Sequence, residues 1–221
     1  AGDLEMDIIS VHSIILYDLI SSGVLTDLTK YCDIVSIMTH EDILDGLYDF
    51  STVDGFFFGV PLYYFGGSVL KVTHLKDKLS VDLPDANWNW HDFYDYAKQV
   101  RRDLDGDGIK DTYIMKANKY HPLFLDAYCC KHVNKVSGKA DFNNDMFVDL
   151  LSLWKKMWDE DLIKAAANPR SEDETVLFTI KSAGYNMGKD EYTYIPALSQ
   201  ELKVYPSEAQ FLCVSSAAKN T

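Results

Sequence analysis

The stretch DGFFFGVPL (Asp54–Leu62) combines a turn with a dense apolar strand, and the interpretation of the chain starts from it. The Asp-Gly pair at its start is typical of a tight turn. The aromatic and apolar run that follows predicts a buried strand. Pro61 has no backbone N–H to donate to a sheet ladder, so the sequence predicts that the strand closes there. We therefore expect the chain to change direction at this residue.

Strands and helices are predicted on both sides of that stretch. A helix begins at the N-cap Asn89, with Asp92 in its first turn, and a second helix covers 144–158. A shorter helix, 14–22, is ended by Gly23. Apolar runs predict strands at 6–11, 68–72, 112–115 and 211–214, and 178–187 is predicted to run from a helix end into a strand. This mixture predicts an α/β fold.

Composition limits the kind of partner. With 221 residues, 47% of them hydrophobic, the chain has enough apolar side chains for one large domain or two small lobes. The net charge of -13 argues against binding to nucleic acid or to an anionic membrane surface, and a neutral or cationic ligand fits better. No apolar run reaches the roughly 18 residues that a membrane span needs. The first six residues lack the pattern of an export signal, so we expect any such signal to be missing from this sequence.

The acidic stretch DLDGDGIKD (Asp103–Asp111) has the spacing of a calcium loop. Oxygen ligands at positions 1, 3, 5, 7 and 9 would come from Asp103, Asp105, Asp107, the carbonyl of Ile109, and Asp111. Position 12, where a bidentate glutamate is expected, holds Ile114, which argues against a helix-loop-helix sensor. Two interpretations stay open, a loop that binds a structural calcium ion and a solvated Asp/Gly turn.

Five stretches, taken in order, resemble the extracellular solute-binding proteins of ABC transporters, in the carbohydrate-binding group with the two-lobed periplasmic-binding fold. They are Met6–Ile9, Gly23–Thr29, Asp54–Pro61, Asn89–Phe93 with Tyr96–Lys98 after it, and Phe178–Tyr185. The acidic loop follows the fourth at the distance familiar in that family. The chain departs from the family pattern in three ways: Phe58 stands where tyrosine is usual, Lys181 stands where glycine is expected, and a later Gly-x-Trp is absent.

This resemblance implies an α/β fold of the periplasmic-binding-protein-like type II, with a complete second lobe and a trimmed first lobe. Members of the family are much longer than this chain, so we expect it to be the middle portion of such a protein. The expected lobes are 1–60 for part of the first, 61–210 for the second with the acidic loop, and 211–221 for a strand returning to the first.

The resemblance also implies a function and a set of residues. The chain would capture a carbohydrate or similar small solute outside the cytoplasm, as a cell-surface lipoprotein or in the periplasm, and deliver it to ABC permease subunits without a chemical step. We expect a monomer. Ligand contacts are expected from Tyr64, Phe65, Tyr120, Tyr185, Asn186 and Tyr192, although each taken alone is more often a packing or surface residue than a ligand contact. Lobe closure would pivot about Gly59, Val60, Pro61 and Val214.

Two other functions stay open from the sequence. A glycoside-acting hydrolase would need two carboxylates facing one cleft at about 5 to 9.5 Å. A calcium-dependent protein-interaction module would use the acidic loop to control docking, but such modules usually repeat the loop and this chain has it once.

Overall fold

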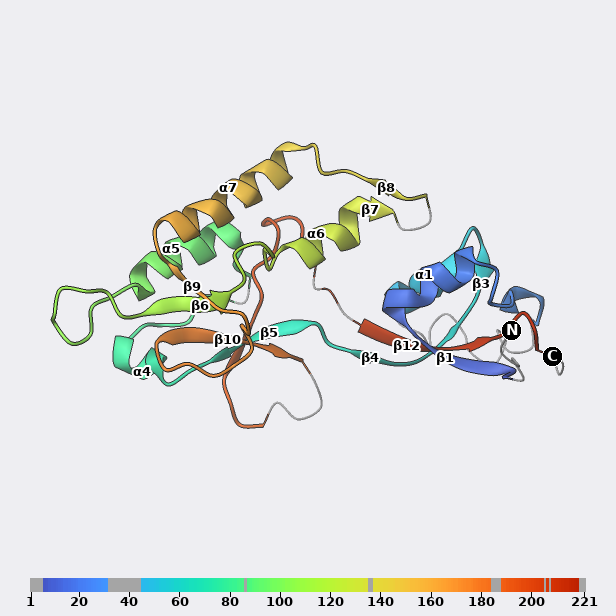
Figure 1. Cartoon of the computed structure of the whole chain (residues 1–221), viewed down its shortest axis with the longest axis horizontal. Coiled ribbons are helices and arrows are strands. Elements are labelled where there is room, and N and C mark those ends of the chain that lie inside the picture. The colour runs from blue at the N-terminus through green and yellow to red at the C-terminus, as the bar shows by residue number, and fades with distance from the viewer. Residues whose placement is uncertain are drawn as a thin grey trace. The chain divides into compact units, whose positions relative to one another are not determined.

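The chain forms two compact units, which are described separately here (Figure 1). The computed structural model describes residues 6–31, 45–85, 87–134, 137–183, 188–204, 206 and 208–218. Unit 1 consists of 1–65, 135–138 and 207–221, and unit 2 consists of 66–134 and 139–206. These bounds differ from the predicted lobes of 1–60, 61–210 and 211–221, because residues 60–65 pair with 208–212 in one sheet.

Unit 1 is built on a three-stranded antiparallel sheet. Its strands, in the order β1-β12-β4, are Ile8–His12, Glu208–Val214 and Val60–Phe65. The helix α1 (Ser13–Ser21) lies over the sheet in Figure 1 and ends, as predicted, before Gly23, which has a φ of 70°. Phe211, Leu16 and Val11 form the centre of the core between helix and sheet. Smaller elements complete the unit: η1 (Leu28–Lys30), α3 (Asp45–Ser51) and the hairpin of β2 (Thr52–Val53) and β3 (Phe56–Phe57).

The stretch predicted as one strand that closes at Pro61 is divided into β3, which ends at Phe57, and β4, which begins at Val60 and runs to Phe65. Pro61 lies inside β4, opposite Phe211, where the register with β12 shifts. β4 is the last strand of its sheet in the described residues, so the missing N–H of proline interrupts no ladder with a further strand there. The prediction of a boundary at Pro61 was therefore wrong, because the sequence does not show that the strand lies at an edge.

Unit 2 is built on a five-stranded sheet in the order β11-β5-β10-β6-β9. The strands are β5 (Ser68–Val72), β6 (Tyr113–Ala117), β9 (Ile163–Ala165), β10 (Val176–Ser182) and β11 (Tyr192–Tyr194). β10, β6 and β9 run parallel to one another, and β5 runs antiparallel to both of its neighbours. β5 has the predicted bounds. The segment predicted to begin at Phe178 is a strand that begins two residues earlier.

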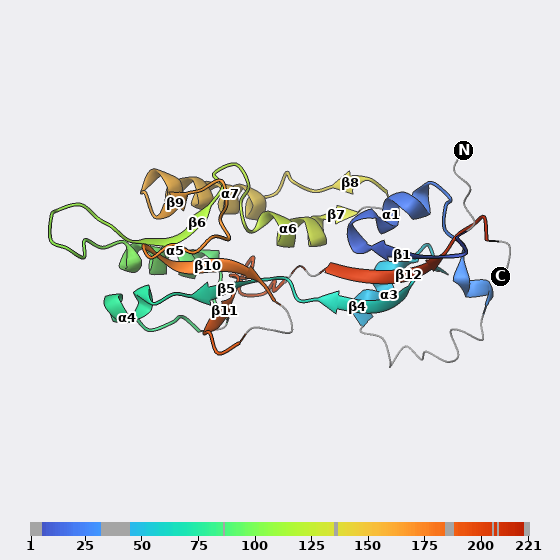
Figure 2. The ribbon, with the colours of Figure 1, turned by 60° about the horizontal axis from the view of Figure 1, so that its bottom comes forward.

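Two long helices cover one face of this sheet (Figures 1 and 2). α5 (Trp90–Val100) begins with a capping box, in which Asn89 and Asp92 satisfy each other's backbone N–H groups, as predicted. α7 (Asp145–Asp159) has Asn144 as its N-cap. Their apolar sides pack on the sheet around Phe178, which is fully buried. Shorter elements are α4 (Leu75–Leu79), α6 (Leu125–His132), β7 (Val133–Asn134) and β8 (Lys139–Ala140).

The connection from β9 to β10, residues 166–175, contains no helix although it must cross β6. Two lysines on strands of the sheet bind this connecting segment. Lys116 on β6 donates to the hydroxyl of Ser171 at 2.6 Å and lies 3.9 Å from a carboxylate oxygen of Asp173. Lys164 on β9 lies 2.8 Å from the same carboxylate. In most α/β units a packed helix makes the connection between two parallel strands. Here the connection is an irregular segment that ion pairs attach to the sheet. Among the described residues, no helix is long and apolar enough to cross a bilayer.

Candidate ligand-binding site

The carboxyl ends of β6, β9 and β10 lie at one edge of the unit 2 sheet, because these strands are parallel. In open α/β sheets, ligands bind outside the carboxyl ends of the strands. We define the carboxyl edge as residues 117–122, 165–171 and 182–183. β5 starts at the same edge, since Ser68 pairs with Ser182. This edge is the candidate site.

The loop that follows β6 presents an aromatic ring at this edge. Asn118 accepts two hydrogen bonds, one at its side-chain Oδ1 from the backbone N–H of Tyr120 at 2.9 Å and one at its carbonyl from that of His121 at 3.2 Å. The carbonyl of Lys119 accepts a hydrogen bond from the indole of Trp154 at 3.1 Å. Tyr120 is 91% exposed. An aromatic side chain is therefore held on an ordered turn with its ring in solvent.

The charge of the carboxyl edge differs from that of the whole chain. Its three segments contain Lys119, His121 and Arg170 and no aspartate or glutamate, although the chain has 34 acidic residues. Arg170 donates to the hydroxyl of Ser182 at 3.4 Å and therefore lies beside the end of β10. The net charge of -13 favoured a neutral or cationic ligand, but the local residues suit a neutral or anionic one.

The structure places the predicted ligand residues at several locations. Tyr120 lies at the carboxyl edge. Tyr64 lies on β4 in unit 1 and is 54% exposed. Tyr192 lies on β11 opposite Lys71, toward the other end of β5. The side chain of Phe65, and all of Tyr185 and Asn186, lie outside the described residues.

Sequence reasoning missed one further aromatic residue near this edge. Tyr194 pairs with Val69, one residue from the Ser68 end of β5, and is about half exposed. The three-residue strand that carries it was not predicted. Its alternation, with Tyr192 and Tyr194 on one face and buried Thr193 on the other, was the only sign of this strand in the sequence.

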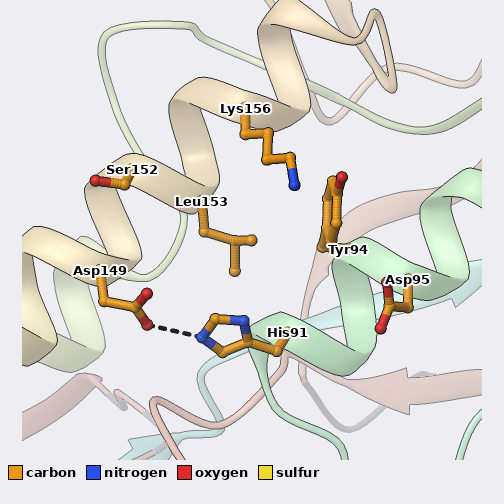
Figure 3. A pocket seen from close by; sticks show the side chains of 7 residues that line it. All are labelled: His91, Tyr94, Asp95, Asp149, Ser152, Leu153 and Lys156. Atoms are coloured by element: carbon orange, nitrogen blue, oxygen red, sulfur yellow. Dashed lines mark hydrogen bonds and ion pairs between the residues drawn. The ribbon is translucent and has the colours of Figure 1, made fainter.

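A hollow of about 360 Å³ lies between α5 and α7, away from the carboxyl edge (Figure 3). His91 of α5 and Asp149 of α7 meet across it, with Nε2 and Oδ2 2.7 Å apart. Lys156 of α7 lies over the ring of Tyr94 at 4.6 Å, and the Tyr94 hydroxyl donates to Glu160 at 2.9 Å. These side chains join the two helices to each other, so we interpret the hollow as part of the helix packing.

A second hollow, of about 380 Å³, lies at the opposite end of the sheet from the carboxyl edge. Residues that follow β5 and residues that precede β10 line it, including Thr73 and Asp173. Asp173 is already bound to lysines of the sheet. Burial alone would raise its pKa, but hydrogen bonds from Lys164 and Thr175 lower the pKa to about 2. The carboxylate therefore stays charged and holds the crossing segment.

The acidic loop brings together three of its carboxylates. Oxygens of Asp103, Asp105 and Asp111 all lie within 4.8 Å of one another. Backbone hydrogen bonds from Gly106 and Gly108 lower the pKa of Asp103, so it is charged. Asp107 lies outside this group of three, and its side chain accepts a hydrogen bond from the N–H of Ile109 at 2.7 Å. The ligand roles predicted for Asp107 and for the Ile109 carbonyl stay predictions.

Solved structures of other proteins have a similar fold. The chain is similar to the sugar-binding protein MalE of Xanthomonas citri, with 13% identity, a TM-score of 0.71, and coverage of 96% of this chain and 58% of that one. An ABC substrate-binding protein of Listeria monocytogenes, in complex with cycloalternan, gives 15% identity and a TM-score of 0.69 over 96% and 57%. The galacto-N-biose-/lacto-N-biose I-binding protein of the ABC transporter of Bifidobacterium longum, in complex with lacto-N-biose, gives 18% identity and a TM-score of 0.67 over 96% and 56%.

The chain has the fold of ABC-transporter sugar-binding proteins. It spans less than three fifths of the length of these structures, so it contains part of their fold. A scan against models of protein families and a search of curated proteins found no match. The predicted fold class is confirmed.

Within this fold, the predicted pivot residues lie inside unit 1. Val60 and Pro61 belong to β4, and Val214 belongs to β12 and pairs with Ile8. Gly59 is buried beside β12, where an added Cβ would come 2.9 Å from the sulfur of Cys213. The chain passes between the units at 65–66, 134–135, 138–139 and 206–207. The hinge role of Gly59, Val60, Pro61 and Val214 stays a prediction.

Proposed function

We propose that this chain captures a carbohydrate, or a similar small solute, as the substrate-binding component of an ABC transporter. The observation that carries this proposal is the similarity in fold to ABC-transporter sugar-binding proteins, which covers 96% of the chain. Two of these proteins are in complex with sugars, cycloalternan in one and lacto-N-biose in the other. The ligand would be delivered to permease subunits after the hinge closure that the sequence resemblance implies. Such a protein works outside the cytoplasm, as a lipoprotein or in the periplasm, and as a monomer.

The carboxyl edge suits a sugar in its chemistry. The face of an aromatic ring packs against the apolar C–H side of a pyranose, and polar groups around it bind the hydroxyls. Tyr120 offers the ring, and Lys119, His121 and Arg170 offer hydrogen-bond donors in the same segments. A hydrolase would need two carboxylates at such a site, and the three segments of the edge contain none. Binding without turnover is therefore the better proposal.

A thermal-shift screen against maltose, lacto-N-biose, glucuronate and mannitol tests this proposal. A ligand that binds only the folded chain stabilises it by about 2.7 kcal/mol at a hundred times its Kd. We expect at least one saccharide to raise the Tm, with no product released on long incubation. Unchanged melting with every saccharide, measured on a chain with a cooperative transition, would contradict the proposal.

We propose in addition that the acidic loop holds a structural calcium ion. Asp103, Asp105 and Asp111 would supply carboxylate oxygens, which calcium prefers. In this proposal the ion stiffens the connection between α5 and β6 and takes no part in ligand chemistry. A calcium-controlled docking module is less well supported, because the similar structures are substrate-binding proteins.

Calcium should raise the Tm of the wild type, and Asp103→Asn should remove most of that rise, because the substitution takes a charged oxygen from the group of three. Asp107→Asn is the matched control: it lies in the same loop but outside the group, and we expect it to keep the rise. Differential scanning calorimetry with calcium, magnesium or a chelator measures the effect. Equal responses of the two variants would refute the proposed ligand set.

A further inference from the structure

The loop that carries Tyr120 is held by a side chain from the core of unit 2. Trp154 of α7 donates its indole Nε1–H to the carbonyl of Lys119 at 3.1 Å. Its side chain is 4% exposed, whereas Tyr120, the next residue along the loop, is 91% exposed. A buried ring therefore fixes the backbone directly beside the aromatic residue of the candidate site.

In the surrounding aromatic cluster, Trp88 also donates its indole N–H to a carbonyl, that of Tyr194 at 2.9 Å, but two other indoles of the cluster do not. Trp90 packs edge-on against Trp154 with ring centroids 6.2 Å apart, and both rings contact Phe124. The Nε1 groups of Trp90 and Trp158 are buried and have no hydrogen-bond partner among the described residues. An unpaired buried N–H is unfavourable, so these indoles contribute through packing alone. Trp154 differs from them in reaching the loop.

The loop has a second support of its own. The Asn118 side chain closes the turn by accepting from the N–H of Tyr120, and the His121 N–H donates to the Asn118 carbonyl. These bonds shape the turn internally, whereas the bond from Trp154 fixes the turn to α7. Together they order residues 118–121 before any ligand arrives. A site that is ordered in advance loses less conformational entropy on binding, so it binds more tightly.

We infer that Trp154 is a positioning residue for ligand binding, which holds the Tyr120 loop in the conformation that meets a saccharide ring. This inference rests on the proposed function. Trp154 would then contribute to saccharide affinity, although its burial alone indicates only a packing role. The role depends on one N–H group, so it can be separated from the packing of the ring.

The test compares Trp154→Phe with Trp90→Phe in the full chain. Both variants replace a buried indole of the same cluster by a smaller ring, but only the first loses a hydrogen bond. We expect the NMR order parameters of the 119–121 amides to be near 0.85 in the wild type and in Trp90→Phe, and to fall below about 0.6 in Trp154→Phe. In titrations with maltose and lacto-N-biose, Trp154→Phe should weaken the binding of a saccharide that the wild type binds by about five-fold. Trp90→Phe should leave that affinity within about two-fold.

The outcomes separate this inference from the proposed function. Unchanged order parameters in Trp154→Phe, or an equal fall in Trp90→Phe, would refute the positioning role even if both proteins bind a saccharide. Order parameters that fall only in Trp154→Phe, with unchanged saccharide affinity, would also refute it, since the loop would then be irrelevant to binding. If the wild type binds no saccharide, the proposed function fails, and the inferred role in binding fails with it.

Discussion

Asp173→Ala is expected to destabilise unit 2 by about 3 kcal/mol, because it leaves a buried lysine without its counter-ion. The side chain of Lys116 is only 7% exposed, and Asp173 is the carboxylate nearest to it, at 3.9 Å. The substitution also removes the partner of Lys164 and the acceptor for the N–H and hydroxyl of Thr175. The segment that crosses β6 would lose its ion pairs with Lys116 and Lys164 and would keep the hydrogen bond from Lys116 to Ser171. Urea unfolding followed by circular dichroism measures the change.

Glu174→Ala is the control for that experiment. Glu174 is the next residue, is exposed, and forms no ion pair in the part of the chain that the structure describes. We expect it to change the free energy of unfolding by less than about 0.5 kcal/mol. A similar loss in both variants would show that the crossing segment does not depend on the Asp173 ion pairs.

The same carboxylate predicts a pH dependence. The pKa of Asp173 is about 2 in the folded chain, against a usual value of 3.8. Because the folded value is the lower one, the stabilising contribution is complete above about pH 4 and is lost as the pH falls toward 2. Lys181 likewise lowers the pKa of Glu172, which adds to the loss in the same direction. We expect the decline of stability in this range to be shallower in Asp173→Asn than in the wild type.

Gly67→Ala is the second substitution with a large expected effect. A Cβ at this position would lie 1.6 Å from the carbonyl oxygen of Pro206, so one of the two backbones must move. The Gly67 carbonyl also accepts the N–H of Ala183 at 2.9 Å, which ties the segment to the end of β10. Overpacking of this kind costs about 2 to 3 kcal/mol. Because Gly67 is hydrogen-bonded to Ala183 of the carboxyl edge, saccharide affinity should fall as well.

Gly46→Ala is the matched control for a glycine substitution. Gly46 lies in α3, and an added Cβ there meets no atom within 4 Å. Alanine is the better helix former, so this variant should be as stable as the wild type or slightly more so. Calorimetric unfolding of both variants tests the difference. A Gly67→Ala protein that melts like the wild type would show that the segments at 67 and 206 are not constrained as described.

Features with a local cause could be predicted from the sequence. The capping box at Asn89 and the end of α1 at Gly23 depend on residues within one turn of the chain, and both predictions hold. Features that depend on distant partners could not. Pro61 indicates the end of a strand unless the strand lies at a sheet edge, and β9 and β11, of three residues each, gain their stability from pairing.

In the candidate site, too, features with a local cause could be predicted and features that depend on distant residues could not. Tyr120 could be chosen because it follows a predicted strand, and the acidic loop could be recognised by its spacing. The support from Trp154 could not, because its helical spacing indicates a core residue and nothing local shows where its N–H lies. The grouping of Asp103, Asp105 and Asp111 was equally hidden, since it depends on the conformation of the loop.

Isothermal titration calorimetry with the saccharide that gives the largest thermal shift, on the wild type, Tyr120→Ala and Phe56→Ala, tests the central claim most directly. Phe56 is a half-exposed aromatic residue on β3 in unit 1, so it controls for the loss of any surface ring. The account predicts saturable binding by the wild type and Phe56→Ala, and at least about ten-fold weaker binding by Tyr120→Ala. Equal affinity of all three proteins would contradict a sugar site at the carboxyl edge of unit 2.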